Sequence, residues 1–273
     1  MSPGPARAAV LARGLGSRMR RDAEAALSPG QVAAASLGWK AMMPIGRRPF
    51  LDFLLSALAD AGVTDVCLVV APDHAPLRER YGPGGVARRT TVSFAVQERP
   101  LGTADAVLAV EAFAAGEELL VLNGDDLYPA EALLALRELP GPGTVLFSPS
   151  ALSSFGRPGD ARATAFAAGI VGPEGFLSDL VEKPGAGLLA SLGDGLLVSM
   201  NCWRLPPAIF EACRRVTPSP RGELELPDAV RIGIRELGLR FRVVRSDRPV
   251  LDLSTRSDVA AVAAALAGWE PRP

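Results

Sequence analysis

The chain is short of lysine, histidine and cysteine, and each shortage narrows the chemistry it can perform. Only two of its 29 basic residues are lysines, and it has one histidine, His74. A lone histidine with no serine motif near it argues against a Ser–His–Asp triad. The three cysteines are scattered, without the spacing of a zinc site or a disulfide framework. We therefore expect reduced thiols and a cytoplasmic protein.

The chain also lacks a long apolar run and an excess of charge of either sign. No stretch approaches the roughly 20 apolar residues that a membrane span needs, and the first residues lack the apolar core of a signal peptide. The formal net charge is only -1, so the overall charge attracts neither nucleic acid nor an anionic membrane. We expect neither as a partner, and any anion site must be local.

A regular alternation of β-type and helical patterns fills the chain up to about residue 140. It predicts an α/β fold with a mostly parallel sheet that helices cover on both faces. Beyond that point the pattern loosens into Gly- and Pro-rich segments, which predict hairpins and connecting loops capping one face of the sheet. A closing helix follows. We expect one domain with an inserted lobe. The β-type runs of the first half are "RAAVLA", "DVCLVVAP", "TVSFAVQ" and "ELLVLNGDD"; the helical segments between and after them include "PFLDFLLSALADAG", "GTADAVLAVEAFA" and "PAEALLALREL".

A glycine-rich stretch, "LARGLGSRMR", follows the first predicted strand. Gly14 and Gly16 would let backbone N–H groups turn inward around phosphate oxygens, with Arg18 as a bidentate clamp. A plain turn between strand and helix is the alternative. A dinucleotide-binding loop would need a third glycine, and Met19 stands in that place.

Two aspartates and the two lysines add to this phosphate chemistry. Asp125 in "VLNGDD" and Asp252 in "VLDLST" follow β-type runs, at the strand ends where α/β sheets bind ligands. Carboxylates there suit a Mg²⁺ that also holds phosphates, although turn chemistry explains the first motif nearly as well. Lys40 and Lys183 persist in an arginine-rich chain, which suggests sites that need a compact ammonium. Chance is the alternative.

Taken in order, these segments resemble the sugar-1-phosphate nucleotidyltransferases, the pyrophosphorylases that make nucleotide sugars. "LARGLGSRM" is similar to the family's glycine loop, "KAMMPIGRRPFLDFLLSALADAG" to its lysine–proline–helix segment and "QERPLGTADAV" to its base-binding stretch. "NGD", "EKP", "GELELPDAV" and "DLSTRSD" then follow in the family's order.

The resemblance implies a GT-A-like Rossmann-type three-layer sandwich with a mostly parallel mixed sheet. The whole chain, 1–273, would form one nucleotidyltransferase domain. A nucleotide-binding half would reach to about residue 140, a sugar-binding lobe with return strands would span about 141–253, and 254–273 would be the C-terminal helix.

The resemblance also implies a role for each matched residue. Arg18, Lys40 and Lys183 would be catalytic, and Asp125 and Asp252 would hold Mg²⁺. The expected nucleotide-binding residues are Leu11, Gly14, Gly16, Ser17, Gln97, Gly102 and Thr103. The expected sugar-binding residues are Gly124, Glu182, Lys183, Asn201 and Glu223.

The implied reaction joins a nucleoside triphosphate to a sugar 1-phosphate, or to a related polyol or cyclitol phosphate, and releases pyrophosphate. A phosphate monoester, with a second pKa of roughly 6, is already an anionic nucleophile, so no acid/base pair is required. Two alternatives stay open: a non-catalytic nucleotide- or sugar-sensing subunit of the same fold, and a nicotinamide oxidoreductase, against which the missing third glycine argues. The base and the sugar stay open as well.

Several positions depart from the family pattern. Arg13 replaces a small residue of the glycine loop, where it would crowd the phosphates or clamp them. The segment between Arg18 and Lys40 is longer than usual, and its helix-like sequence predicts a lid or a subunit contact. Ser254 stands where glycine is common, and "SMNCW" replaces a glycine–aromatic pattern on the sugar side. The inserted helix and the "GIVGPEGF" hairpin could pack against a second copy of the chain, so a homo-oligomer is one option for the assembly.

Overall fold

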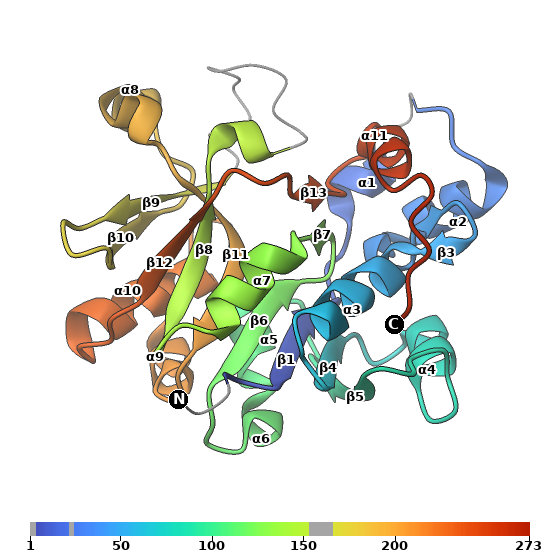
Figure 1. The fold of residues 1–273 in the computed structure, drawn as a ribbon, viewed down its shortest axis with the longest axis horizontal. Coiled ribbons are helices and arrows are strands. Elements are labelled where there is room, and N and C mark those ends of the chain that lie inside the picture. The colour runs from blue at the N-terminus through green and yellow to red at the C-terminus, as the bar shows by residue number, and fades with distance from the viewer. Residues whose placement is uncertain (1–3, 22–24, 153–165) are drawn as a thin grey trace.

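A nine-stranded mixed sheet forms the centre of the computed structural model, which describes residues 4–21, 25–152 and 166–273. The strand order along the main path is β10-β9-β11-β6-β1-β4-β5, and β8 joins β11 to β12 beside it. Helices cover both faces of the sheet (Figure 1). The α/β sandwich expected from the sequence is thus confirmed.

The parallel half of the sheet contains β1 (Arg7–Leu11), β4 (Asp65–Val70), β5 (Thr91–Val96) and β6 (Leu119–Asn123). These strands run in one direction, with β1 paired to both β4 and β6. Apolar residues on both faces of a strand are typical of a sheet that is covered on both sides. The alternation of strands and helices predicted for this half is therefore correct.

The helix expected over residues 102–114 is two helices. α5 (Thr103–Leu108) ends before α6 (Glu111–Ala114) begins. At the break, the Val110 N–H bonds to the Val107 carbonyl only three residues back. This tightened turn interrupts the α-helical ladder and places the Val110 side chain in the core, where it is fully buried.

The second half of the sheet was predicted less well. The hairpin of β9 (Ala167–Val171) and β10 (Leu177–Val181) is as expected. The stretch around residues 198–205 was expected among hairpins and connecting loops that cap one face, but β11 (Val198–Leu205) is a strand within the main sheet, antiparallel to β6. The glycines and prolines that flank it suggested a loop, but its side chains fill the core on both faces of the sheet. The remaining strands here are β8 (Gly143–Phe147) and β12 (Arg242–Ser246).

One apolar core lies on each face of the sheet. The first packs under α3 (Phe50–Asp60) and α7 (Ala130–Arg137), and the second under α5, α9 (Ile209–Arg215) and α10 (Leu226–Glu236). The other helices are α1 (Ser17–Arg21), α4 (Ala75–Tyr81), α8 (Ala186–Leu192), α11 (Asp258–Ala265) and the 3-10 turns η1 (Lys40–Met42), η2 (Pro149–Ala151) and η4 (Gly193–Gly195). None of the helices in the described ranges is long and apolar enough to cross a membrane.

Two short ribbons and one inserted helix complete the structure near the carboxyl edge of the sheet. The ribbons are β2 (Pro44–Ile45) with β3 (Arg48–Pro49), and β7 (Asp126–Leu127) with β13 (Leu251–Asp252). The segment after Arg18 was expected to be helical, and it forms α2 (Pro29–Leu37), while its residues 22–24 lie outside the described part. A capping box between Ser28 and Gln31 begins α2, and Gly38 in the left-handed conformation ends it.

Candidate active site

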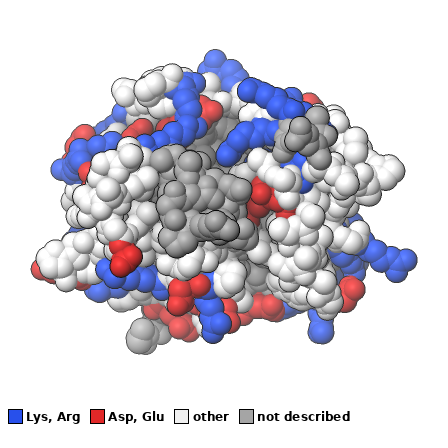
Figure 2. Space-filling view, turned by 90° about the horizontal axis from the view of Figure 1, so that it is seen from above, with Lys and Arg blue, Asp and Glu red and all other residues white. Residues whose placement is uncertain are grey.

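A cavity of about 380 Å³ lies where the parallel strands end. β1, β5 and β6 bring Leu11, Gln97 and Asn123 to one edge of the sheet, and the antiparallel β11 begins at that same edge. Ligands of open α/β sheets bind at this edge. Figure 2 looks down on it and shows acidic side chains gathered near the middle of the face, with basic side chains beside them.

Most of the residues expected from the sequence line this one cavity. Three expected residues, Lys40, Lys183 and Gly124, are not among the described residues that line it. Gly124 is buried just behind it, and its N–H bonds to the Leu11 carbonyl. The expected residues that do line the cavity are Leu11, Gly14, Gly16, Ser17, Arg18, Gln97, Gly102, Thr103, Asp125, Glu182, Asn201, Glu223 and Asp252.

The glycine loop after β1 packs directly on the end of the inserted helix α2. Gly16 and Gly38 both have positive φ, of 55° and 74°. A Cβ on Gly16 would lie 2.6 Å from the Gly38 Cα, and a Cβ on Gly38 would lie 2.2 Å from the Leu15 carbonyl oxygen. Only glycine permits so close an approach of two backbones in this conformation. The inserted helix therefore fixes the position of the loop that lines the cavity.

Lys40 reaches the cavity wall through an ion pair. Its Nζ lies 2.7 Å from Asp125 Oδ2, and 13% of the lysine side chain is exposed. Burial lowers the pKa of the ammonium, but the charges of Asp125 and Asp252 outweigh that effect and raise the pKa above its ordinary value. Lys40 is therefore a permanent cation beside two carboxylates.

Two buried carboxylates face each other across the short ribbon of β7 and β13. Asp126 pairs in register with Asp252. Burial raises the pKa of both groups, and neighbouring carboxylates raise them further, that of Asp252 to about 6. Asp126 Oδ1 and Asp252 Oδ2 are buried, and no hydrogen-bond partner for either stands in the described ranges. Carboxylate oxygens without a partner, beside a cavity of about 380 Å³, fit a divalent cation, which prefers oxygen ligands and keeps several waters.

Gln97 lines the cavity at the end of β5, and its amide nitrogen is already hydrogen-bonded. Nε2 donates to the Gly102 carbonyl at 2.9 Å and to Asp105 Oδ2 at 2.8 Å, so Oε1 is the atom left to meet a ligand. Arg13 lines the same cavity, and its side chain turns toward the segment after β5. Its guanidinium donates to the carbonyls of Gln97 and Glu98 and so ties the glycine loop to the segment after β5.

Acidic side chains and one arginine form the opposite wall. Arg221 Nη2 lies 2.6 Å from Glu225 Oε1, 3.5 Å from Glu182 Oε1 and 3.8 Å from Glu223 Oε2. Burial and the charge of Glu225 raise the pKa of Glu182, while Arg221 lowers it. Lys183, next to Glu182, is exposed and has a left-handed backbone, with φ of 46°. This wall therefore offers hydroxyl acceptors next to cations.

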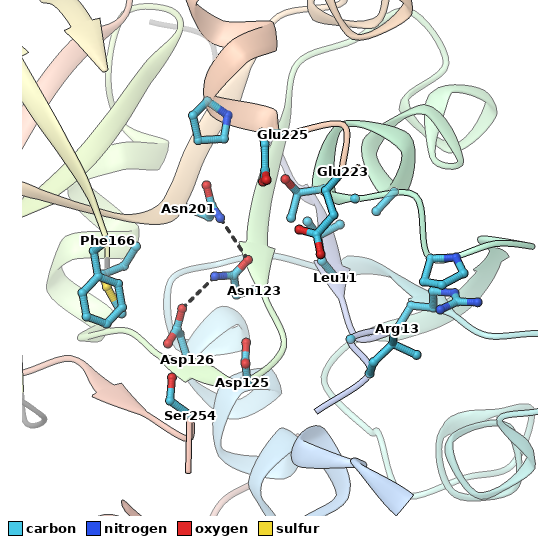
Figure 3. Close-up of a pocket in the computed structure, with 18 of the residues that line it drawn as sticks. Leu11, Arg13, Asn123, Asp125, Asp126, Phe166, Asn201, Glu223, Glu225 and Ser254 are labelled. Atoms are coloured by element: carbon cyan, nitrogen blue, oxygen red, sulfur yellow. Dashed lines mark hydrogen bonds between the residues drawn. The ribbon is translucent and has the colours of Figure 1, made fainter. Parts of the chain in front are cut away.

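Several residues that line the cavity were not among the expected site residues, among them Asn123, Arg221 and Glu225. Asn123 stands in "NGDD" and Glu225 in "GELELPDAV", whereas Arg221 comes directly before the second motif. Figure 3 shows Asn123, Asp126 and Asn201 pointing toward one another at the floor of the cavity. The position of these residues in or beside the two motifs was the available signal in the sequence.

Comparison with known proteins decides the family. A family model described as nucleotidyl transferase matches residues 36–269, most of the chain. The chain belongs to the nucleotidyl transferase family. The resemblance found in the sequence is confirmed at this level.

Named relatives of this nucleotidyl transferase are sugar-phosphate enzymes. It is 29% identical to glucose-1-phosphate thymidylyltransferase of Streptomyces griseus over 82% of this chain and 56% of that protein. It is 26% identical to UTP--glucose-1-phosphate uridylyltransferase AglF of Haloferax volcanii over 92% of each. The chain thus spans a little over half of the first relative and nearly all of the second.

The fold of this nucleotidyl transferase is shared with solved structures. A crystal structure of UDP-glucose pyrophosphorylase complexed with UDP-glucose aligns with a TM-score of 0.73 and 18% identity, over 95% of this chain and 97% of that one. At this identity the likeness concerns the fold.

Proposed function

We propose that this chain is an enzyme that joins a nucleoside triphosphate to a sugar 1-phosphate, or to a related polyol or cyclitol phosphate, and releases pyrophosphate. One observation carries the proposal: a single cavity is lined by the glycine loop and carboxylates on one side and by the Glu182–Arg221 wall on the other. Such a cavity can hold two phosphorylated molecules end to end. The names of the relatives support the same reaction class.

The proposed reaction is an in-line displacement at the α-phosphorus. An anionic oxygen of the sugar phosphate forms the new bond, the bond from the α-phosphorus to the oxygen it shares with the β-phosphate breaks, and pyrophosphate leaves with that electron pair. Both reactants are anions, so positioning and charge make up most of the barrier. Arg18, Lys40 and Lys183 supply cations from this chain, and Arg221 adds one on the sugar side.

The proposed nucleotide site follows the β1 edge. The backbone of Gly14 and Gly16, with Ser17, would cradle the triphosphate, since these residues line the cavity together with Arg18. Leu11, Gln97, Gly102 and Thr103 would surround the base. The residues proposed for the sugar phosphate are Gly124, Glu182, Lys183, Asn201 and Glu223.

Asp125 and Asp252 are the proposed ligands of Mg²⁺. The orphaned oxygen of Asp252 and the partly exposed Asp125 support this assignment. When bound, the cation would neutralise charge on the phosphates. In this chain Lys40 holds Asp125 in place through their ion pair. The proposed enzyme acts in the cytoplasm, in keeping with three buried free cysteines.

Pyrophosphate release tests the proposal. The assay crosses ATP, GTP, CTP, UTP and dTTP with a panel of sugar and cyclitol 1-phosphates in the presence of Mg²⁺. Release that requires one nucleotide together with one phosphate establishes the reaction and names both substrates. Triphosphate binding without release from any pair would instead favour a sensing subunit.

A further inference from the structure

Strand β11 contains an irregularity at the floor of the cavity. Its pairing with β8 shifts register between Ser199 and Cys202. Inside this bulge Asn201 has a φ of 52°, in the left-handed region that non-glycine residues rarely adopt. Bulges near ligand sites often redirect a side chain, and strained residues persist where the surroundings hold them. The strain at Asn201 therefore calls for a functional reason.

Trp203 fixes the orientation of the Asn201 amide. Its indole Nε1 donates to Asn201 Oδ1 at 3.2 Å, and an indole nitrogen can only donate. The amide nitrogen of Asn201 must then be the other atom, and it donates to Asn123 Oδ1 at 3.4 Å. Trp203 is fully buried, so this anchor is rigid.

Asp126 fixes the Asn123 amide in the same way. Asn123 Nδ2 donates to Asp126 Oδ2 at 2.9 Å. The Tyr128 hydroxyl lies 2.7 Å from the Met200 carbonyl, within the bulge, and 3.2 Å from Asp126 Oδ2, and it accepts from the Asn123 N–H. The Asn201–Asn123 and Asn123–Asp126 hydrogen bonds are the dashed lines in Figure 3. With the Trp203–Asn201 bond they form a continuous hydrogen-bonded relay from the indole to the buried carboxylate.

The relay leaves one hydrogen on each amide nitrogen. Each nitrogen carries two hydrogens and gives one to the relay, and the residues described offer no acceptor for the second. Both asparagines are half-buried and line the cavity. The floor therefore presents two oriented donors, while Glu182 and Glu223 on the wall offer acceptors.

We propose that Asn123 and Asn201 form a specificity-determining pair whose amide hydrogens bind one ring oxygen substituent, a hydroxyl or carbonyl, of the sugar or cyclitol phosphate. This inference rests on the proposed function. A hydroxyl can accept from the amides and donate to a carboxylate at once, which matches a polyhydroxylated ring. A site built to bind a hydroxyl strongly rejects an analogue that lacks it.

Asn201→Gly tests the pair because it removes the amide and also relieves the strained backbone. We expect the KM for the sugar phosphate to rise about tenfold and the KM for the triphosphate to change less than twofold. The variant should also lose discrimination against the one deoxy or fluoro analogue that wild type rejects. A purely structural asparagine would leave both sugar readouts unchanged.

Ala115→Gly is the matched control. Ala115 has a φ of 53°, ends α6 and is exposed, so the substitution relieves the same strain outside the cavity. Asn123→Ala, the second variant, should reproduce the change in sugar-phosphate KM. The inference is overturned if either asparagine variant keeps the wild-type KM and analogue preference.

Binding measurements separate this inference from the reaction itself. If wild type releases no pyrophosphate with any pair, the proposed function fails. Calorimetry with the same sugar and cyclitol phosphates then compares wild type with Asn201→Gly. Weaker binding by the variant supports the pair without turnover, and equal binding or none to either protein overturns it.

Discussion

The cavity has two proposed sides, a nucleotide side along the glycine loop and a sugar side along the Glu182–Arg221 wall, and different kinds of group line them. On the nucleotide side the contacts come largely from backbone: glycines with positive φ, carbonyls that accept from Gln97 and Arg13, and a helix end packed on a loop. On the sugar side they come from the side chains of Asn123, Asn201, Glu182 and Arg221. Backbone can hold a group common to all nucleotides, such as a triphosphate, whereas side chains can change to suit one sugar. We infer that specificity for the sugar resides in these side chains.

The two sides are nevertheless tied together at one point. The Leu224 N–H bonds to the Leu101 carbonyl, the Ala104 N–H bonds to the Leu224 carbonyl, and the Leu226 N–H bonds to Thr103 Oγ1. A Cβ on Gly102 would lie 2.4 Å from the Leu224 carbonyl oxygen. The start of α5 and the segment that carries Glu223 therefore hold a fixed relative position.

Asp125→Asn should give the largest effect, because Asp125 stands where the two sides meet. The substitution removes the carboxylate that pairs with Lys40 and that we propose as a metal ligand. We expect kcat to fall about 100-fold or more, the scale of a lost electrostatic contact in a catalytic site, with little change in melting temperature. Asp60→Asn, at a surface ion pair with Arg89, is the control. Turnover at the wild-type rate would remove Asp125 from the site.

Gly38→Ala tests whether the nucleotide side depends on backbone geometry. The new Cβ would collide with the Leu15 carbonyl and displace the glycine loop. We expect kcat/KM for the triphosphate to fall about 30-fold, since a displacement of one ångström can cost ~100-fold in rate. Steady-state kinetics at saturating sugar phosphate measure it.

Gly46→Ala separates close packing from backbone strain. Gly46 has a similar positive φ of 59°, and among the described residues nothing lies within 4 Å of its added Cβ. This variant should lose some stability but keep triphosphate kinetics near wild type. Equal kinetic losses in the two variants would mean that the contact with α2 does not position the loop.

The contrast between backbone and side-chain contacts also explains which parts of the fold and of the site could be predicted from the sequence. The parallel strands and the glycine loop follow from apolar runs and the turns after them, which are local signals. The direction of Arg13 is not local, because its acceptor, the Gln97 carbonyl, lies 84 positions away. The bulge at Asn201 depends on how β11 pairs with β8, and Arg221 faces Glu182 only after two distant loops meet. Side-chain sites therefore needed the structure.

Arg221→Ala should affect the sugar side alone. Arg221 holds Glu182 and Glu225 in place through ion pairs, so its loss should displace the acceptors that we propose for the sugar hydroxyls. We expect the KM for the sugar phosphate to rise about tenfold, the scale of a hydrogen bond to a charged group, and the KM for the triphosphate to stay constant. Arg240→Ala, which breaks an exposed ion pair with Glu174, is the control. A matching rise in both KM values would show that the two sides act as one unit.

The smallest expected effect concerns the free energy of unfolding and involves His74. Its ring stacks on Trp39, which precedes Lys40 in the chain, with ring centroids 4.8 Å apart. Burial lowers the pKa of His74 below its ordinary value, and Asp73 raises it only in part. Near pH 6.5 the unfolded chain therefore binds a proton that the folded chain does not, so the free energy of unfolding decreases as the pH falls below about 6.5. His74→Phe keeps a stacking ring that cannot take up a proton. Between pH 8 and pH 5.5, the free energy of unfolding measured with urea should fall on the order of 1 kcal/mol more for wild type than for the variant. Equal pH dependence in the two proteins would show that protonation of His74 does not affect stability.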